Sequence, residues 1–171
     1  MTEGAAAELL LQEYLAIQKI YEGYNAQSLS IKEWSVSIGI ASLLAAYAKP
    51  VAEMRGRAVV VLAALVSVPF YLTDALWKSY QAAYLPRLRE IEAAFRDMAG
   101  DQPAALQAIA SWAKAYGDGV ADAPAEGALT LYLGAMANPA VLLPHAVLLV
   151  LGLVMAWAYP PHPPARRETR A

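Results

Sequence analysis

The sequence contains no cysteine and little charge. None of its 171 residues is Cys, which excludes disulfide bonds, thiolate metal sites and a cysteine nucleophile. Charged side chains make up only 16% of the chain, against about 25% in ordinary globular proteins. The net charge of -2 provides no positive field that would attract nucleic acid. We therefore expect no nucleic-acid partner.

Catalytic and metal-binding patterns are missing as well. The sequence has no Ser/His/Asp constellation, no phosphate-binding loop and no zinc-ligand spacing. Gly117-Asp118-Gly119 is typical of a turn, not of a nucleotide fingerprint. Glu90 and Glu92 are two residues apart, so on a helix their side chains point in different directions and are poorly placed to bind one metal ion together. We expect no enzyme activity, no metal site and no cofactor.

Apolar sequence is abundant instead. Hydrophobic residues make up 58% of the chain, above the roughly 45–50% of ordinary domains. Three blocks contain no Asp, Glu, Lys or Arg, namely 34–48, 58–73 and 127–165. Such blocks form either the core of a soluble helical bundle or membrane spans, and three in a short chain favour spans. The sequence predicts an all-α integral membrane protein with three transmembrane helices and a helical cytoplasmic layer.

The predicted chain has five segments. They are an amphipathic N-terminal helix (1–31), a transmembrane hairpin (32–78), a cytoplasmic helical section (79–126), an interfacial helix followed by the third transmembrane helix (127–159) and a flexible tail (160–171). The start of the chain has no basic residue and no apolar stretch directly after it, so we expect no cleavable signal peptide.

Tryptophan and lysine mark the ends of the predicted spans, as is typical of membrane–water interfaces. These anchors are Lys32, Trp34, Trp77, Lys78 and Trp157. The residues from Ala58 to Met98 are predicted to form one long helix that leaves the membrane near Lys78. Pro69 should kink this helix or free the carbonyl near Leu65, and Pro86 bends or divides it.

Two apolar stripes at helical spacing predict helix packing outside the spans. The first contains Tyr14, Ile17, Tyr21 and Tyr24, and the second contains Leu88, Ile91 and Phe95. The charged residues of the N-terminal helix, Glu13 among them, are expected elsewhere around that helix. An amphipathic helix has little stability alone in water. We therefore expect the stripes to pack on each other or on a cytoplasmic partner protein.

A stripe of small residues follows one face of the first span. Its members are Ser35, Gly39, Ser42 and Ala46. Small residues let helices approach closely in lipid, so the stripe predicts tight packing or, through its serines, the lining of a polar path.

Two ionisable residues near the spans are candidates for an ion path. Asp74 lies near the end of the second span and either serves such a path or rests in the headgroup zone, paired with Lys78. His145 follows Pro144 in the third span, where an imidazole shuttles protons, binds a metal or simply hydrogen-bonds a neighbouring helix.

Three strings of this sequence carry a resemblance. Residues 28–35 read SLSIKEWS, residues 74–81 read DALWKSYQ, and Asn138-Pro139 precedes Leu143-Pro144-His145. Together they resemble a group of small, uncharacterised bacterial inner-membrane proteins with an N-terminal helix, a hairpin of spans and a helical cytoplasmic section. The resemblance implies the bacterial inner membrane and a cytoplasmic N-terminus, but no activity. Lys and Arg are equally numerous on the two predicted sides, so the positive-inside rule does not choose the orientation.

Two functional hypotheses fit these observations, both with the lipid bilayer as surroundings. In the first, a homo-oligomer forms or regulates an ion path, with Asp74 at its mouth. In the second, the chain is a non-conducting scaffold or accessory subunit that binds a partner through its cytoplasmic helices.

Overall fold

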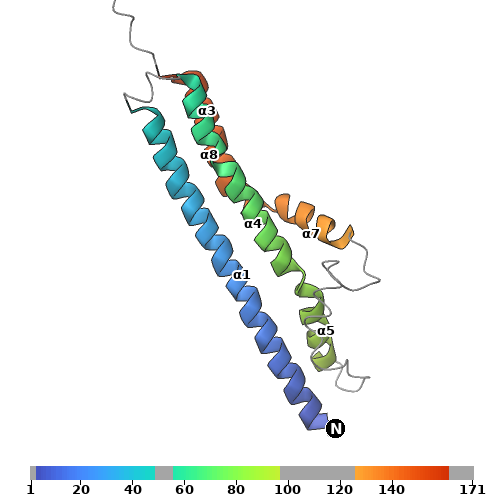
Figure 1. Ribbon diagram of the computed structural model, residues 1–171. Helices are drawn as coiled ribbons and strands as arrows, with labels where there is room; N and C mark the ends of the chain where they lie inside the picture. Colours follow the sequence, from blue (N-terminus) through green and yellow to red (C-terminus); the bar gives the residue numbers. More distant parts are fainter. Residues whose placement is uncertain (1–2, 49–55, 97–125, 162–171) are drawn as a thin grey trace, which may run out of the picture. The chain divides into compact units, whose positions relative to one another are not determined.

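The computed structural model describes residues 3–48, 56–96 and 126–161. Within them every regular element is an α-helix, as predicted. The helices are α1 (Glu3–Ala46), α3 (Arg57–Leu65), α4 (Ser67–Ala82), α5 (Leu85–Arg96), α7 (Glu126–Met136) and α8 (Pro139–Ala158) (Figure 1). Much of the predicted cytoplasmic section and most of the predicted tail lie outside the described residues.

Helix α1 is one continuous helix of 44 residues, although the sequence predicted an amphipathic helix followed by a separate span. The change at residue 31 is a change of composition only. No proline occurs between Glu3 and Ala46, so every residue there can donate the backbone hydrogen bond that a helix requires. Pro50 is the first proline of the chain, four residues after α1 ends.

The predicted helix from Ala58 to Met98 is helical over Arg57–Phe95, but it is interrupted twice, at the two positions where proline was expected to act on it. Helix α3 ends at Leu65 and α4 ends at Ala82. These residues precede Pro69 and Pro86 by four positions, so their carbonyls are the ones that each proline cannot bond. The Oγ of Ser67 donates to the carbonyl of Ala64 (2.9 Å) next to the first interruption. The expected effect of Pro69 near Leu65 is therefore confirmed.

Among the described residues, three helical runs are long and apolar enough to cross a membrane. They are Ala5–Ala46, Arg57–Phe95 and Pro139–Ala158. Helix α7 is apolar but shorter, with Gly127–Met136 as its apolar part. It ends just before Asn138-Pro139, the point at which the sequence divided the last uncharged block.

The chain divides into two compact units. Unit 1 comprises residues 1–29 and 74–138, and unit 2 comprises residues 30–73 and 139–171. Helix α1 contributes to both units, as does α4.

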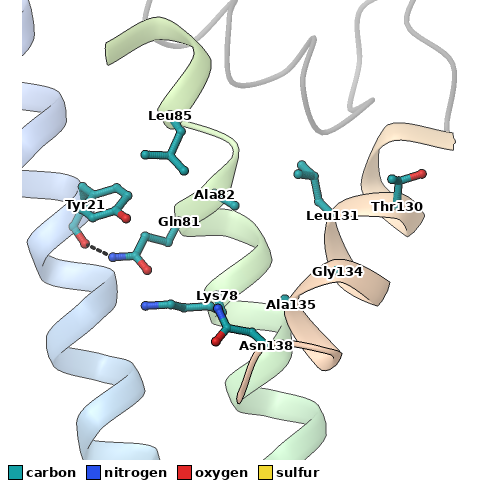
Figure 2. Close-up of a pocket in the computed structure, with 10 residues that line it drawn as sticks. All are labelled: Tyr21, Lys78, Gln81, Ala82, Leu85, Thr130, Leu131, Gly134, Ala135 and Asn138. Atoms are coloured by element: carbon teal, nitrogen blue, oxygen red, sulfur yellow. Dashed lines mark hydrogen bonds between the residues drawn. The ribbon is translucent and has the colours of Figure 1, made fainter. Parts of the chain in front are cut away.

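Unit 1 is held together by apolar, aromatic and ionic contacts. Leu10 and Ile17 of α1 pack with Ile91 of α5, and Tyr14, Tyr84 and Leu88 border this cluster. The two predicted stripes thus lie against each other, although Phe95 is 38% exposed. Figure 2 shows α4 with α1 on one side and α7 on the other, and a hydrogen bond from Gln81 Nε2 to the carbonyl of Tyr21 (3.0 Å).

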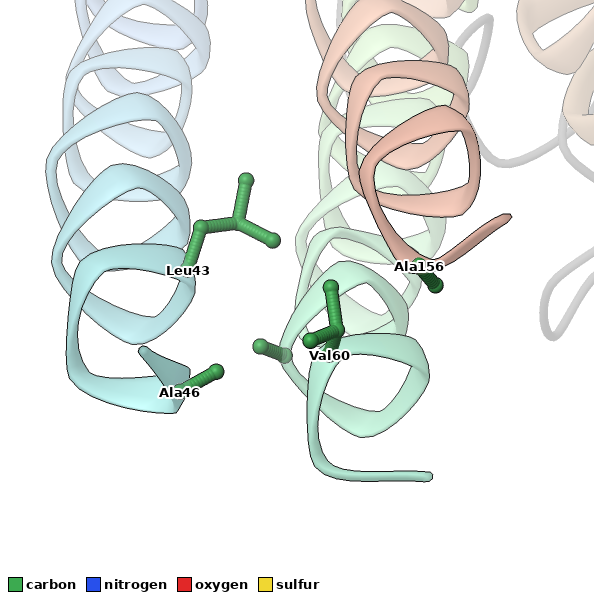
Figure 3. Packing of buried hydrophobic residues seen from close by; sticks show 5 residues of the cluster. Leu43, Ala46, Val60 and Ala156 are labelled. Atoms are coloured by element: carbon green, nitrogen blue, oxygen red, sulfur yellow. The ribbon is translucent and has the colours of Figure 1, made fainter. Parts of the chain in front are cut away.

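Unit 2 is built on small side chains. Leu43 and Ala46 at the end of α1 pack with Val60 and Ala63 of α3 and with Ala156 of α8 (Figure 3). The end of one helix therefore meets the beginning of the next, as expected for an antiparallel hairpin. Helix α3 also packs along α8.

Two glycines set the close approach of these helices. A Cβ at Gly152 of α8 would lie 3.0 Å from Leu43 Cδ2 and 3.1 Å from Ala64 Cα. A Cβ at Gly39 of α1 would lie 3.1 Å from Leu148 Cδ1. Such contacts are typical of helices that pack in lipid through small residues.

Candidate functional site

The imidazole of His145 is buried inside unit 2. Residues 141 to 148 of α8 present Val141, His145 and Leu148 on one buried face, at spacings of four and three. His145 is only 2% exposed. Its Nδ1 lies 2.8 Å from Oγ of Ser35 in α1, and the two atoms share a hydrogen bond whose donor depends on the imidazole tautomer.

A small pocket adjoins this imidazole. Tyr71 of α4 places its ring centroid 6.0 Å from that of His145, and both residues line a pocket of about 100 Å³ together with Ser67 and Leu149. A water molecule needs roughly 10–15 Å³ of such volume and two to four polar partners. The pocket thus has the volume of a water site, but most of its lining is apolar, with Val68, Leu142 and Ala146 completing its wall.

Asp74 occupies a buried position in unit 1. Its residue exposure is 0%, and Oγ of Ser28 in α1 donates a hydrogen bond to Oδ1 of Asp74. A carboxyl group buried in this way needs such a partner, because burial of an unpaired polar group is costly. Asp74 is thus held inside the protein rather than projecting from it.

The small-residue stripe of α1 faces the interior of unit 2. Ser35 and Gly39 contact residues of α8, and Ala46 belongs to the cluster with Val60. Ser42 is half-buried. The contacts of this stripe are therefore mainly with other helices of the same chain.

The predicted interface anchors differ in their surroundings. Trp34 and Trp157 are 63% and 80% exposed. Trp77 is half-buried, with its ring centroid 5.5 Å from that of Tyr24 and 5.8 Å from that of Tyr80. Lys78 and Lys32 are also half-buried, and Lys78 lines a pocket with Tyr21 of the first stripe.

An ion pair that the sequence did not reveal joins α1 to α5 in unit 1. Arg87 donates from Nε to Glu13 Oε1 (3.0 Å) and from Nη2 to Glu13 Oε2 (2.8 Å). The Arg87 side chain is fully buried and that of Glu13 is 2% exposed. Arg87 also donates to Glu90 (3.1 Å), whose side chain is 54% exposed. The expectation that Glu13 lies away from the packed face is wrong.

The described residues hold no cluster of three or more His, Cys, Asp or Glu side chains arranged for a metal ion. Comparisons with protein-family models, curated proteins and solved structures find no match to this chain.

Proposed function

We propose that the chain is an integral membrane protein that crosses the bilayer three times, with a helical layer on the cytoplasmic side of a bacterial inner membrane. The distribution of side chains in α8 supports this proposal. Its buried face carries His145, Gly152 and Ala156 among its members. Its exposed face carries large apolar side chains: Leu142, Leu143, Val147, Val150, Leu151, Leu153, Val154 and Trp157. An outer face more apolar than the inner one is the arrangement that lipid favours.

We further propose that several copies of this membrane protein assemble into a homo-oligomer that forms or regulates an ion path. Protons are the ions that this path transports. The observation that carries this proposal is the buried His145, which lies in an apolar helix, shares a hydrogen bond with Ser35 and adjoins a pocket. Ionisable side chains are rare at membrane depth because of their cost there, and they commonly mark proton relays. Asp74, also buried, is the second candidate group.

Proton flux into liposomes tests this function. Liposomes that contain the purified protein and an internal pH-sensitive dye receive a membrane potential from a potassium gradient and valinomycin. We expect dye acidification with the native sequence, and a rate equal to that of protein-free liposomes for His145→Gln and Asp74→Asn. The matched control is His162→Gln, since His162 is the other histidine of the chain. Flux that survives both substitutions contradicts the proposed path.

A non-conducting scaffold or accessory subunit is the second candidate. The specific observation in its favour is that Ser35 and Gly39 are already covered by His145 and Leu148 of the same chain. Side chains that pack inside one chain are unavailable to line a path between chains. Mass determination in native lipid discs separates the two functions: a closed oligomer with flux supports the path, whereas a monomer without flux supports the scaffold.

A further inference from the structure

Unit 1 contains a second pocket, larger than the one beside His145. It lies where α1, α4 and α7 meet and has a volume of about 280 Å³ (Figure 2). Helix α1 contributes Tyr21 to the wall of the pocket. Helix α4 and the first residue of α5 contribute residues between Lys78 and Leu85. The third wall consists of residues between Thr130 and Asn138, from α7 and the residue that precedes α8. The pocket is thus formed by three segments that are far apart in the sequence.

The polar groups of this pocket suit an anion. Lys78 is the one charged side chain among the ten lining residues, and none of them is acidic. In Figure 2 the Lys78 side chain extends towards α1, and Asn138 lies where α7 ends. Both residues line the pocket, and Thr130 of α7 adds a hydroxyl group to the lining. The hydrogen bond from Gln81 to the carbonyl of Tyr21 fixes the wall between α1 and α4. Ala82, Leu85 and Leu131 make the remaining wall apolar.

The sequence positions of Lys78 and Asn138 indicate the depth of the pocket. Lys78 directly follows Trp77 at the end of the apolar part of α4, and Asn138 directly precedes α8, which begins at Pro139. Lys78 therefore stands where an apolar segment meets polar sequence, and Asn138 stands at the start of a helix long enough to span a membrane. The fold brings both residues to one pocket. If the chain crosses the bilayer as proposed above, this pocket lies at the level of the lipid headgroups.

We propose that this pocket binds the headgroup of an anionic phospholipid, with the phosphate beside Lys78 and Asn138. Cationic pockets beside membrane helices are typical binding sites for lipid headgroups. The volume is below the roughly 300–1,000 Å³ of sites for drug-sized ligands, and thus suits a headgroup rather than a whole lipid. The glycerol of phosphatidylglycerol would extend past Gln81 towards Thr130, while the acyl chains remain in the bilayer.

Native mass spectrometry of the full chain, released from discs of mixed phosphatidylglycerol and phosphatidylcholine, tests this site. We expect phosphatidylglycerol to be retained in preference to phosphatidylcholine. Lys78→Gln should lower the phosphatidylglycerol affinity about fivefold, the effect expected for one basic residue at a membrane surface. Lys32→Gln is the matched control, because Lys32 is a predicted interface lysine outside this pocket.

A second variant fills the pocket and leaves its charge in place. A Cβ at Gly134 would meet no atom within 4 Å, so Gly134→Leu projects into open space and should expel the lipid without disturbing α7. Equal retention of the two lipids, or undiminished phosphatidylglycerol in both Lys78→Gln and Gly134→Leu, overturns the proposal. Carbonate extraction separates this failure from that of the proposed membrane function, because a protein that resists extraction yet shows no lipid preference loses only the headgroup site.

Discussion

Ser35 of α1 and His145 of α8 share a hydrogen bond of 2.8 Å across 110 residues of sequence, and both side chains are buried. This contact joins two helices that are each apolar enough to span a membrane. It therefore contributes to helix association as well as to the surroundings of the imidazole.

Loss of the Ser35 hydroxyl should weaken the association of α1 with α8. Hydrogen bonds between membrane helices contribute about 0.6 kcal/mol on average and up to about 1.7 kcal/mol. We expect Ser35→Ala to lower the free energy of unfolding by about 1 kcal/mol in detergent micelles titrated with a denaturing detergent. Ser37→Ala is the matched control, because Ser37 lies on the same helix and is exposed. Equal stability of the two variants would show that the Ser35–His145 bond is not stabilising.

The buried ion pair of unit 1 should be far more sensitive to the loss of one partner. Arg87→Met leaves the Glu13 carboxylate buried without its bidentate partner, and breaking a buried pair in this way costs about 3–5 kcal/mol. Arg89→Met removes the same charge from an exposed position two residues away and should change stability little. The double variant Glu13→Leu with Arg87→Met should recover most of the loss, because a well-packed apolar pair replaces a buried ion pair at little cost. Similar unfolding curves for Arg87→Met and Arg89→Met would contradict the pairing.

Gly152 should not tolerate a side chain. The Cβ of Gly152→Ala would press on the backbone of α3 at Ala64 and on Leu43 of α1, so the helices must separate. We expect a loss of about 1–3 kcal/mol, as for overpacking in other cores, measured by the same detergent titration. Gly23→Ala provides the control: a Cβ there meets nothing within 4 Å, and alanine in a helix is favoured over glycine by roughly 0.5–1 kcal/mol. A neutral Gly152→Ala would refute the close approach.

Sequence periodicity and charge predicted the helical framework. The uncharged blocks correspond to apolar helices. This part was predictable because the absence of charged residues from a stretch depends on that stretch alone and not on its partners in the fold. The division at Asn138-Pro139 and the interruption at Leu65 followed from proline, which acts on a carbonyl four residues away. The continuity of α1 was missed because composition changes at residue 31 while backbone hydrogen bonding does not.

The sequence did not predict which polar side chains contact each other between helices. Glu13 is separated from Arg87 by 74 residues, and Ser28 is separated from Asp74 by 46. Periodicity assigns a residue to a face but does not identify a partner on another helix. Glu13 is three residues from Leu10 and four from Ile17, both fully packed, and this spacing was the available sign that its carboxylate faces inward.

Labelling of single cysteines in sealed membrane vesicles tests the membrane account most directly. The chain has no native cysteine, so Thr2→Cys and Ala171→Cys each place one thiol on an unlabelled background. Three crossings put the two positions on opposite sides of the bilayer. We expect a membrane-impermeant maleimide to label one variant in intact vesicles and the other only after permeabilisation. Labelling of both variants from the same side, or their release from the membrane by carbonate, would contradict a chain that crosses the bilayer three times.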